Sequence, residues 1–360
     1  MSGHEILIWV MAIFAVLGAV DRLLGNRFGL GEGFEEGIMA MGSLALAMVG
    51  IVSLAPVLAG MLRPVVVPVY RFLGADPAMF AGSILACDMG GGALAAQMAQ
   101  DPQAALLGGV ITGSMLGATL VFTIPVAMGI LAPEDIPVMA KGILCGIVTV
   151  PLGILAGGLG AGYPIGMVLK NLIPIVLIGL LIALGLWRAE KAMVRGFAVL
   201  GKVILGIATV GLAMAALEAL TGFPIVPGMA PISEGFQTVG TIAIVLAGAF
   251  PLVALITKLL RRPLTALGKG LGINDTAAAG LIASLANSIA TFNMVKDMDQ
   301  RGKVVNIAFA VSAAFVFGDH LGFTAGFAPE LLGAMILGKL TGGISAIGVA
   351  LLLTQKEHRI

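Results

Sequence analysis

Long apolar stretches separated by short polar connections run along the whole chain of 360 residues. Most of them are about twenty residues long or longer, enough for a helix to cross roughly 30 Å of hydrocarbon. The pattern therefore predicts an all-α polytopic membrane protein. We expect uninterrupted helices over nine stretches: Glu5–Leu24, Gly37–Leu62, Gln103–Leu131, Val138–Leu159, Met167–Leu186, Phe197–Leu220, Gln237–Leu260, Val304–Thr324 and Leu331–Thr354.

Two further apolar segments are interrupted by residues that disfavour a helix. The first, Phe80–Gln97, carries a lone carboxylate at Asp88, followed by three consecutive glycines. Each glycine costs about 1 kcal/mol relative to alanine inside a helix, so three in a row favour a break. The second, Thr276–Met294, has a polar half that begins at Asn287 and Ser288. Counting these two segments, we predict about nine to eleven transmembrane segments.

The two interrupted segments correspond in an internal repeat with an offset of 198 residues. Identical residues at this offset are Leu73-Gly74 with Leu271-Gly272, Ala81-Gly82 with Ala279-Gly280, Ile84 with Ile282, Ser114 with Ser312, and Lys141 with Lys339. The repeat sets Asp88 beside Ala286-Asn287. It divides a single transporter domain, residues 1–360, into repeat one (about 34–160), connecting helices (about 165–222) and repeat two (about 236–354).

The positions of the basic residues bear on whether the interrupted segments cross the membrane. If both cross fully, the basic residues at 258–269 lie on the opposite side from those at 296–303, against the positive-inside rule. If both segments are re-entrant, the two clusters share the cytoplasmic side. Four basic residues then remain outside: Arg63, Arg71, Lys170 and Lys339. This favours nine full spans, two re-entrant hairpins and inverted repeats, the alternative being that these connections are exceptions to the rule.

Composition narrows the classes of function. The chain is 59% hydrophobic and 11% charged, with a net charge of +1 and no basic tract, so we expect lipid around it and no nucleic-acid partner. The two cysteines, Cys87 and Cys145, lie in apolar runs and are interpreted as small buried hydrophobes rather than a disulfide or a metal site. Nucleotide-binding fingerprints and metal-ligand spacings are missing from the sequence, so neither a cofactor nor a metal is predicted.

Asp88 is the leading candidate for binding, because a carboxylate inside an apolar run is costly and marks a functional site by default. It would attract a cationic substrate, a coupling ion or a proton. The alternative is a carboxylate exposed to water at the mouth of a hairpin. Neutral hydrogen-bonding groups in the same regions are Asn287, Ser288, Ser83 and Ser312. Their alternative role is to satisfy backbone groups or to link helices.

A second polar group, Asp319-His320, lies late in the stretch expected to form the penultimate helix. A histidine titrates near neutral pH, which suits a proton-linked gate. The alternative is a pair at the membrane edge. Asp88 and Asp319 could also form the dyad of an intramembrane aspartyl protease. That chemistry is usually marked by Gly-x-Gly-Asp, but the run here is Val316-Phe317-Gly318-Asp319, so the first glycine is missing.

Several of these stretches together resemble one family of membrane proteins. The shared motifs are Phe34-Glu35-Glu36-Gly37, Met39-Ala40-Met41-Gly42, Met79-Phe80-Ala81-Gly82, Ala86-Cys87-Asp88-Met89-Gly90-Gly91, Asp299-x-Arg301-Gly302-Lys303-Val304, Ala310-Val311-Ser312-Ala313-Ala314-Phe315 and Gly318-Asp319-His320-Leu321-Gly322-Phe323. They resemble the ethanolamine permease family, EutH, in order along nearly the whole chain. Two departures are a short connection at 160–167 and a segment at 286–290 without a second asparagine and a proline.

The resemblance implies a permease, not an enzyme, that moves ethanolamine across the bacterial inner membrane. Ethanolamine is a small cation with a hydroxyl group. We expect Asp88 to bind the ammonium group, the Asn287 region to bind the hydroxyl, and Asp319-His320 to serve in gating or in a proton response. The alternative is an ion-coupled carrier for another small polar or cationic solute on a similar scaffold. The number of protomers stays open, with a homo-oligomer among the options.

Overall fold

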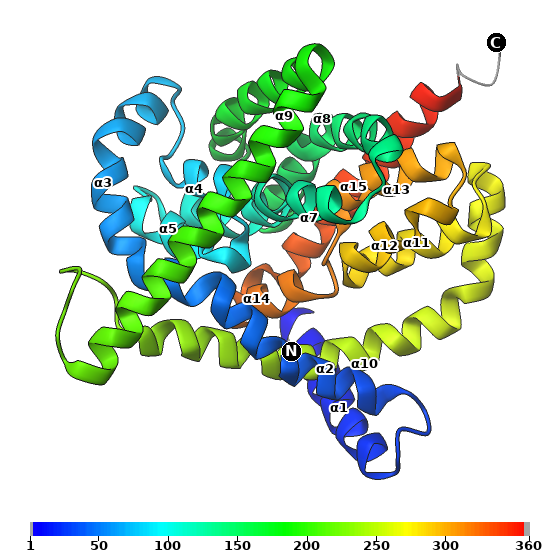
Figure 1. Cartoon of the computed structure of the whole chain (residues 1–360), viewed down its shortest axis with the longest axis horizontal. Coiled ribbons are helices and arrows are strands. Elements are labelled where there is room, and N and C mark those ends of the chain that lie inside the picture. Colours follow the sequence, from blue (N-terminus) through cyan, green and yellow to red (C-terminus); the bar gives the residue numbers. More distant parts are fainter. Residues whose placement is uncertain (1–2, 356–360) are drawn as a thin grey trace.

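A computed structural model describes residues 3–355, leaving aside the side chains of residues 257, 260–267, 269 and 355. Across these residues the chain is helical, and no strand is found (Figure 1). The α-helices are α1 (Gly3–Leu23), α2 (Leu30–Leu44), α3 (Gly50–Phe72), α4 (Ala78–Ile84), α5 (Gly91–Met98), α6 (Pro102–Leu106), α7 (Ile124–Ile130), α8 (Ile136–Gly160), α9 (Ile165–Thr221), α10 (Ile232–Leu271), α11 (Asp275–Ala286), α12 (Ser288–Met294), α13 (Gln300–Ala313), α14 (Asp319–Phe327) and α15 (Leu332–Gln355).

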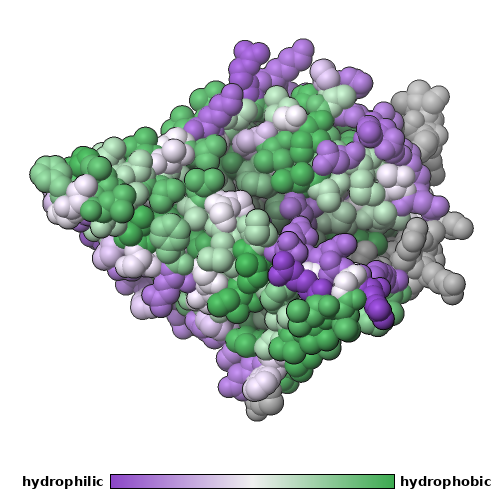
Figure 2. All heavy atoms as spheres, turned by 60° about the horizontal axis from the view of Figure 1, so that its bottom comes forward, coloured by the Kyte–Doolittle hydropathy of each residue, from purple (hydrophilic) through white to green (hydrophobic). Residues whose placement is uncertain are grey.

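Among the described residues, seven helical stretches are long and apolar enough to cross a membrane. Their outer faces are apolar too: Leu181, for example, is 68% exposed. Figure 2 shows broad apolar areas on one face of the molecule, separated by smaller groups of hydrophilic side chains. A surface of this kind suits lipid rather than water, so the chain is a multi-pass membrane protein. The 57-residue α9 changes direction at Ala189 (φ −146°, ψ 48°), which separates the two helices predicted there.

The second predicted helix, Gly37–Leu62, is longer than expected. Helix α2, a short π-helix over Ala45–Val49 and α3 form one continuous run from residue 30 to residue 72. The residues after Leu62, where the predicted helix ended, are therefore helical as far as Phe72. The prolines among them do not end the helix, as is common where neighbouring helices and local π-type turns satisfy the freed backbone groups.

Both interrupted segments break where predicted. Helix α4 ends before an extended Leu85 (φ −128°, ψ 140°), and α5 begins after Gly90, which has a φ of 86°. Gly90 is required twice over: its φ lies in the left-handed region, and a Cβ there would stand 2.2 Å from Cγ2 of Ile51. In the second segment, an extended Asn287 (φ −156°, ψ 126°) separates α11 from α12.

The predicted single helix Val304–Thr324 is wrong, because the chain forms two helices there. Helix α13 ends at Ala313, the chain turns through residues 314–318, and α14 begins at Asp319. Phe315 has a φ of 63°, and the amides of Phe315 and Phe317 donate to the carbonyls of Ser284 and Leu285, at 3.0 and 2.8 Å. The turn is therefore stabilised by backbone pairing with the second interrupted segment, a contact far away in the sequence.

The last helix, α15, packs closely against α8 through small residues. A Cβ added to Gly153 would stand 2.8 Å from the carbonyl oxygen of Gly338, and the reverse distance is also 2.8 Å. Such close approach between helices is typical of packing in lipid. It brings the inner face of α15, which carries Lys339, to the centre of the molecule.

Candidate functional site

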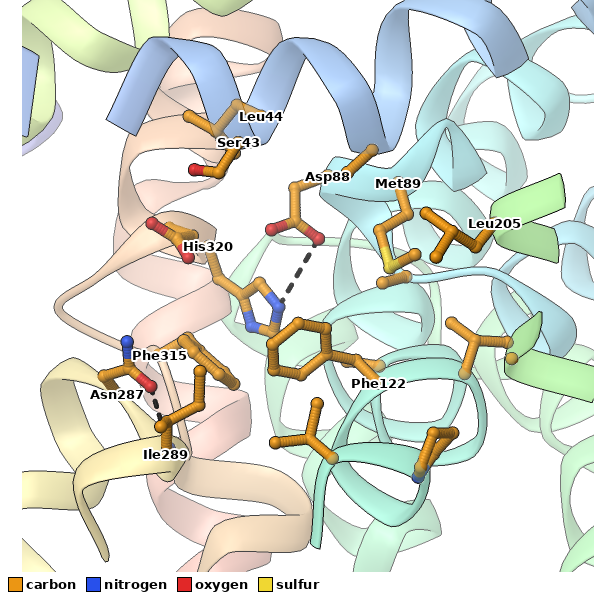
Figure 3. A pocket seen from close by; sticks show the side chains of 18 of the residues that line it. Ser43, Leu44, Asp88, Met89, Phe122, Leu205, Asn287, Ile289, Phe315 and His320 are labelled. Carbon is orange, nitrogen blue, oxygen red and sulfur yellow. Dashed lines mark hydrogen bonds and ion pairs between the residues drawn. The ribbon is translucent and has the colours of Figure 1, made fainter. Parts of the chain in front are cut away.

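A cavity of about 540 Å³ lies where the two breaks meet the start of α14. Four predicted site residues line it: Asp88, Asn287, Asp319 and His320. Figure 3 shows Asp88 and His320 facing each other, with the rings of Phe122 and Phe315 beside them and Asn287 at a second wall. Residues of α2, such as Ser43, and of α9, such as Lys202, complete the wall. The two interrupted segments thus meet at one polar cavity.

Asp88 lies in a single 3₁₀ turn, Cys87–Met89, between α4 and α5. Its side chain is 13% exposed, and one oxygen, Oδ1, stands 3.7 Å from Nε2 of His320. That distance is longer than a hydrogen bond. The carboxylate therefore keeps acceptor capacity for a ligand in the cavity.

His320 contacts Lys339, a residue outside the cavity lining. The lysine Nζ lies 2.9 Å from Nδ1 of the imidazole and donates to the carbonyl oxygen of Ser114 at 2.5 Å. When Lys339 is an ammonium group it has donors only, so Nδ1 is then the acceptor and the ring proton sits on Nε2, the nitrogen that faces Asp88. A chain of groups thus runs from the interior through His320 to the cavity.

The structure corrects the sequence-based placement of two lysines. Lys339, expected on the outer surface, is 1% exposed inside α15. Lys303, counted in the cytoplasmic cluster, is 8% exposed and forms a 2.6 Å ion pair with Asp135. Lys339 is also a site residue that sequence reasoning missed, although a lone lysine within an apolar run was a usable signal. Within the other cluster, the side chains of Arg261, Arg262 and Lys269 lie outside the described residues.

Asp319 is the first residue of α14, so the helix dipole favours its negative charge. The aromatic wall lies close by: the Phe122 and Phe315 rings meet edge to face at 5.5 Å, and Phe315 lies 5.2 Å from the His320 ring. Ring faces near carboxylates suit an organic cation.

Asn287 has a structural role as well as a place in the cavity wall. Its Oδ1 accepts from the amide of Ile289 at 2.8 Å and so caps α12 (Figure 3). The expectation that this residue satisfies backbone groups is therefore confirmed for Oδ1. The side-chain nitrogen is the part of Asn287 left to a ligand.

The three serines named as substrate-binding candidates are not among the residues lining the cavity. Ser83 donates to the carbonyl of Met79 within its own helix, at 2.7 Å. The hydroxyls of Ser288 and Ser312 are buried without a hydrogen-bond partner. Ser312 lies against Gly342 of α15, where a Cβ would stand 2.7 Å from its Oγ.

Three possible metal ligands lie near the cavity: Cys87, Asp88 and His320 each offer an atom, all within 4.8 Å of one another. Thiolate and imidazole are donors that transition metals accept. However, Lys339 occupies Nδ1 of the histidine, and its buried positive charge would repel a divalent cation at this distance. The arrangement suits a group that donates hydrogen bonds to Asp88 better than a metal ion.

Comparison with known proteins gives one consistent result. The family model "Ethanolamine utilisation protein, EutH" matches residues 4–353. The chain is 58% identical over 356 residues to "Probable ethanolamine permease EutH" of Listeria monocytogenes, covering 99% of this chain and 95% of that protein. It is 46% identical over 395 residues to the protein of the same name in Escherichia coli, covering 99% and 97%.

A third relative, "Uncharacterized protein YxeR" of Bacillus subtilis, is 53% identical over 357 residues, covering 99% of this chain and 96% of the relative. No solved structure matches the chain. The alignment with the Escherichia coli protein is longer than the 360 residues of this chain, so that relative carries residues that this chain lacks. Over nearly its whole length, the chain belongs to the EutH family of ethanolamine utilisation proteins.

Proposed function

We propose that this protein is a permease that moves ethanolamine across the bacterial inner membrane, with the central cavity as its substrate site. Two of its relatives are named as probable ethanolamine permeases. The observation that carries the proposal for this chain is the cavity between the two breaks, which holds Asp88 and Asp319 in an apolar and aromatic surround.

The charges of the cavity fit one monovalent cation. Its lining holds two carboxylates, Asp88 and Asp319, and one lysine, Lys202, while Lys339 lies behind His320 and outside the lining. The two carboxylates attract an alkylammonium group, whereas they repel an anion and offer a neutral amide no opposite charge. We assign the ammonium group of ethanolamine to Asp88 and its hydroxyl to the Asn287 side-chain nitrogen. Asp319 and His320 adjust the local charge as the site opens and closes.

Asp88 is the residue to test first. Asp88→Asn keeps the shape but removes the charge that attracts the ammonium group, so we expect ethanolamine uptake into proteoliposomes to fall at least tenfold. Binding of ethanolamine, measured by titration calorimetry, should weaken similarly. The control is Glu134→Gln, which removes an exposed carboxylate remote from the cavity lining. Wild-type affinity in Asp88→Asn would remove Asp88 from the site.

The same proposal includes two re-entrant hairpins related by an inverted repeat. In the first interrupted segment, the Asp76 carboxylate accepts from the amides of Gln100 and Asp101, both at 2.9 Å, so the two ends of the segment meet. In the second, the Asp299 carboxylate accepts from the amide of Asn274 at 2.8 Å. These pairs keep the offset of the sequence repeat, since 274 − 76 and 299 − 101 are both 198. Matching closures at matching positions support a repeated hairpin.

A second candidate function is an ion-coupled carrier for another small amino alcohol. The cavity volume favours it, because about 540 Å³ exceeds the size of ethanolamine alone. Competition of labelled ethanolamine with choline and propanolamine would separate the two. Uptake with and without an imposed proton or sodium gradient would show whether an ion is coupled. We expect ethanolamine to compete better than choline, because a quaternary ammonium group cannot donate to Asp88.

A further inference from the structure

A second, smaller cavity of about 220 Å³ lies on the other side of the break between α4 and α5, at Gly90. Helices α3, α5, α10 and α14 all contribute to it. Its lining residues are Met48, Val52, Ala55, Pro56, Gly90, Ala93, Ala96, Gln97, Ala230, Glu234, Thr238, Phe323 and Phe327.

The wall between the two cavities is thin. Met89 lines the central cavity and Gly90 lines the second, although the two residues are neighbours in the chain. Likewise, Ala47 faces the central cavity and Met48 faces the second, and both belong to the π-helix Ala45–Val49. Gly90 packs against Ile51 without space for a side chain. Short π-helices often mark functional sites, where the helix can change its register.

The chemistry of the second cavity also suits an organic cation. Phe323 and Phe327 stack with their ring centres 4.9 Å apart and their planes 19° apart, and both rings lie against Gly92. Glu234 is the ionisable residue of the lining. An aromatic face beside one carboxylate attracts an ammonium group through the ring quadrupole and the negative charge together.

We propose that this second cavity is a second binding site for a small primary alkylammonium ion, separated from the Asp88 cavity by the Gly90–Ile51 contact. The inference rests on the proposed function, since it makes the second cavity the next position of the substrate along its path. Glu234 is the counter-charge there, and the Phe323–Phe327 stack is the aromatic wall.

Thiol labelling in the full-length protein tests this site directly. Ala93→Cys places a thiol in the lining, and the two natural cysteines are fully buried, so the chain without Ala93→Cys provides the background rate. The probes are 2-aminoethyl methanethiosulfonate, which carries a primary ammonium group, and methyl methanethiosulfonate, which is neutral. The rate of each probe with the introduced thiol is divided by its rate with a small thiol in solution. We expect this relative rate to be higher for the cationic probe.

Further substitutions in the Ala93→Cys protein separate binding from mere access. Glu234→Gln should lower the ratio of cationic to neutral rates at least threefold, and Phe327→Leu should lower it as well. Glu134→Gln should leave it unchanged. Millimolar ethanolamine should slow the cationic probe at the introduced thiol, and this protection should persist when Asp88→Asn is added. An unchanged ratio in Glu234→Gln, or protection lost with Asp88→Asn, would overturn the second site.

The labelling result is independent of transport. If wild-type proteoliposomes take up no ethanolamine while the Ala93→Cys thiol still shows charge-selective labelling and protection, the permease proposal fails and the second site stands. If uptake occurs without charge selectivity at that thiol, the permease stands and the second site is rejected.

Discussion

Lys339 changes the chemistry expected of the central cavity, because it places a buried cation behind His320. A buried charge is stable only with partners that satisfy it. Here the partners are the Ser114 carbonyl and the His320 ring, and through that ring the lysine is linked to Asp88. The position of the histidine proton, and thus the group that faces a substrate, depends on a residue outside the cavity wall.

Replacing this lysine tests its role. Lys339→Met keeps the length of the side chain but removes the donor to the Ser114 carbonyl and to His320 Nδ1, and a buried group that loses its partner costs about 1–3 kcal/mol. The imidazole can then take either tautomer, so Nε2 no longer presents a proton to Asp88 at all times. We expect ethanolamine uptake per folded molecule to fall at least tenfold and its pH profile to shift.

The matched control removes another buried lysine together with its partner. Lys303→Met combined with Asp135→Met deletes an ion pair that is not part of the cavity lining, and removing both charges avoids leaving one unpaired. Uptake per folded molecule should stay within twofold of wild type. A normal pH profile and normal uptake in Lys339→Met would show that the lysine only fills space.

Sequence reasoning identified some of these residues and missed others for physical reasons. Asp88, Asp319 and His320 stand out because ionisable groups in apolar runs are costly. The serines were wrongly placed in the cavity lining, because sequence alone does not show when a hydroxyl bonds to the carbonyl of its own helix, as that of Ser83 does. Lys339 was missed because the positive-inside rule counts a lysine by its sign and cannot tell whether it is buried.

Some features of the helices could likewise be predicted from the sequence, and others could not. The breaks at Gly90 and Asn287 were predictable, because glycines and a capping asparagine are local signals. The turn at 314–318 was not, since it depends on the distant carbonyls of Ser284 and Leu285. The extent of α3 to Phe72 was hidden by its prolines, which would end a helix in water but here lie inside a packed one.

The two hairpin closures lead to a prediction about stability. Asp76→Ala removes the acceptor shared by the amides of Ala78, Gln100 and Asp101 and so loosens the first hairpin. Asp299→Ala does the same in the second hairpin, where the carboxylate holds Asn274 and caps α13. We expect both variants to lower the free energy of unfolding by about 1–3 kcal/mol, measured as a lower Tm in detergent.

Exposed Glu134→Ala is the control and should leave the Tm unchanged. A loss of stability in one hairpin variant but not in the other would mean that the two closures are not equivalent. The proposed repeat would then keep its sequence offset but lose its structural support.

Across the whole molecule, burial of the two lysines alters the charge argument for an inverted topology. Removing Lys339 from the outside leaves three basic residues there, Arg63, Arg71 and Lys170, while the inside loses Lys303. The excess of basic residues on the cytoplasmic side therefore persists. Under the proposed topology, the connection after α5 lies outside the cell and the connection after α12 lies inside, so the two hairpins would approach the cavity from opposite sides.

Cysteine labelling in intact cells tests this arrangement. Gln103 and Gln300 are exposed residues just beyond the two closures, and the natural cysteines are buried, so single cysteines at these positions report on their own loops. A membrane-impermeant maleimide should label Gln103→Cys in intact cells and Gln300→Cys only in inverted vesicles. Labelling of both from the same side would mean that the second interrupted segment, Thr276–Met294, crosses the bilayer. In that case the two interrupted segments would not be a pair of inverted hairpins, and entry of the hairpins from opposite faces would have to be abandoned.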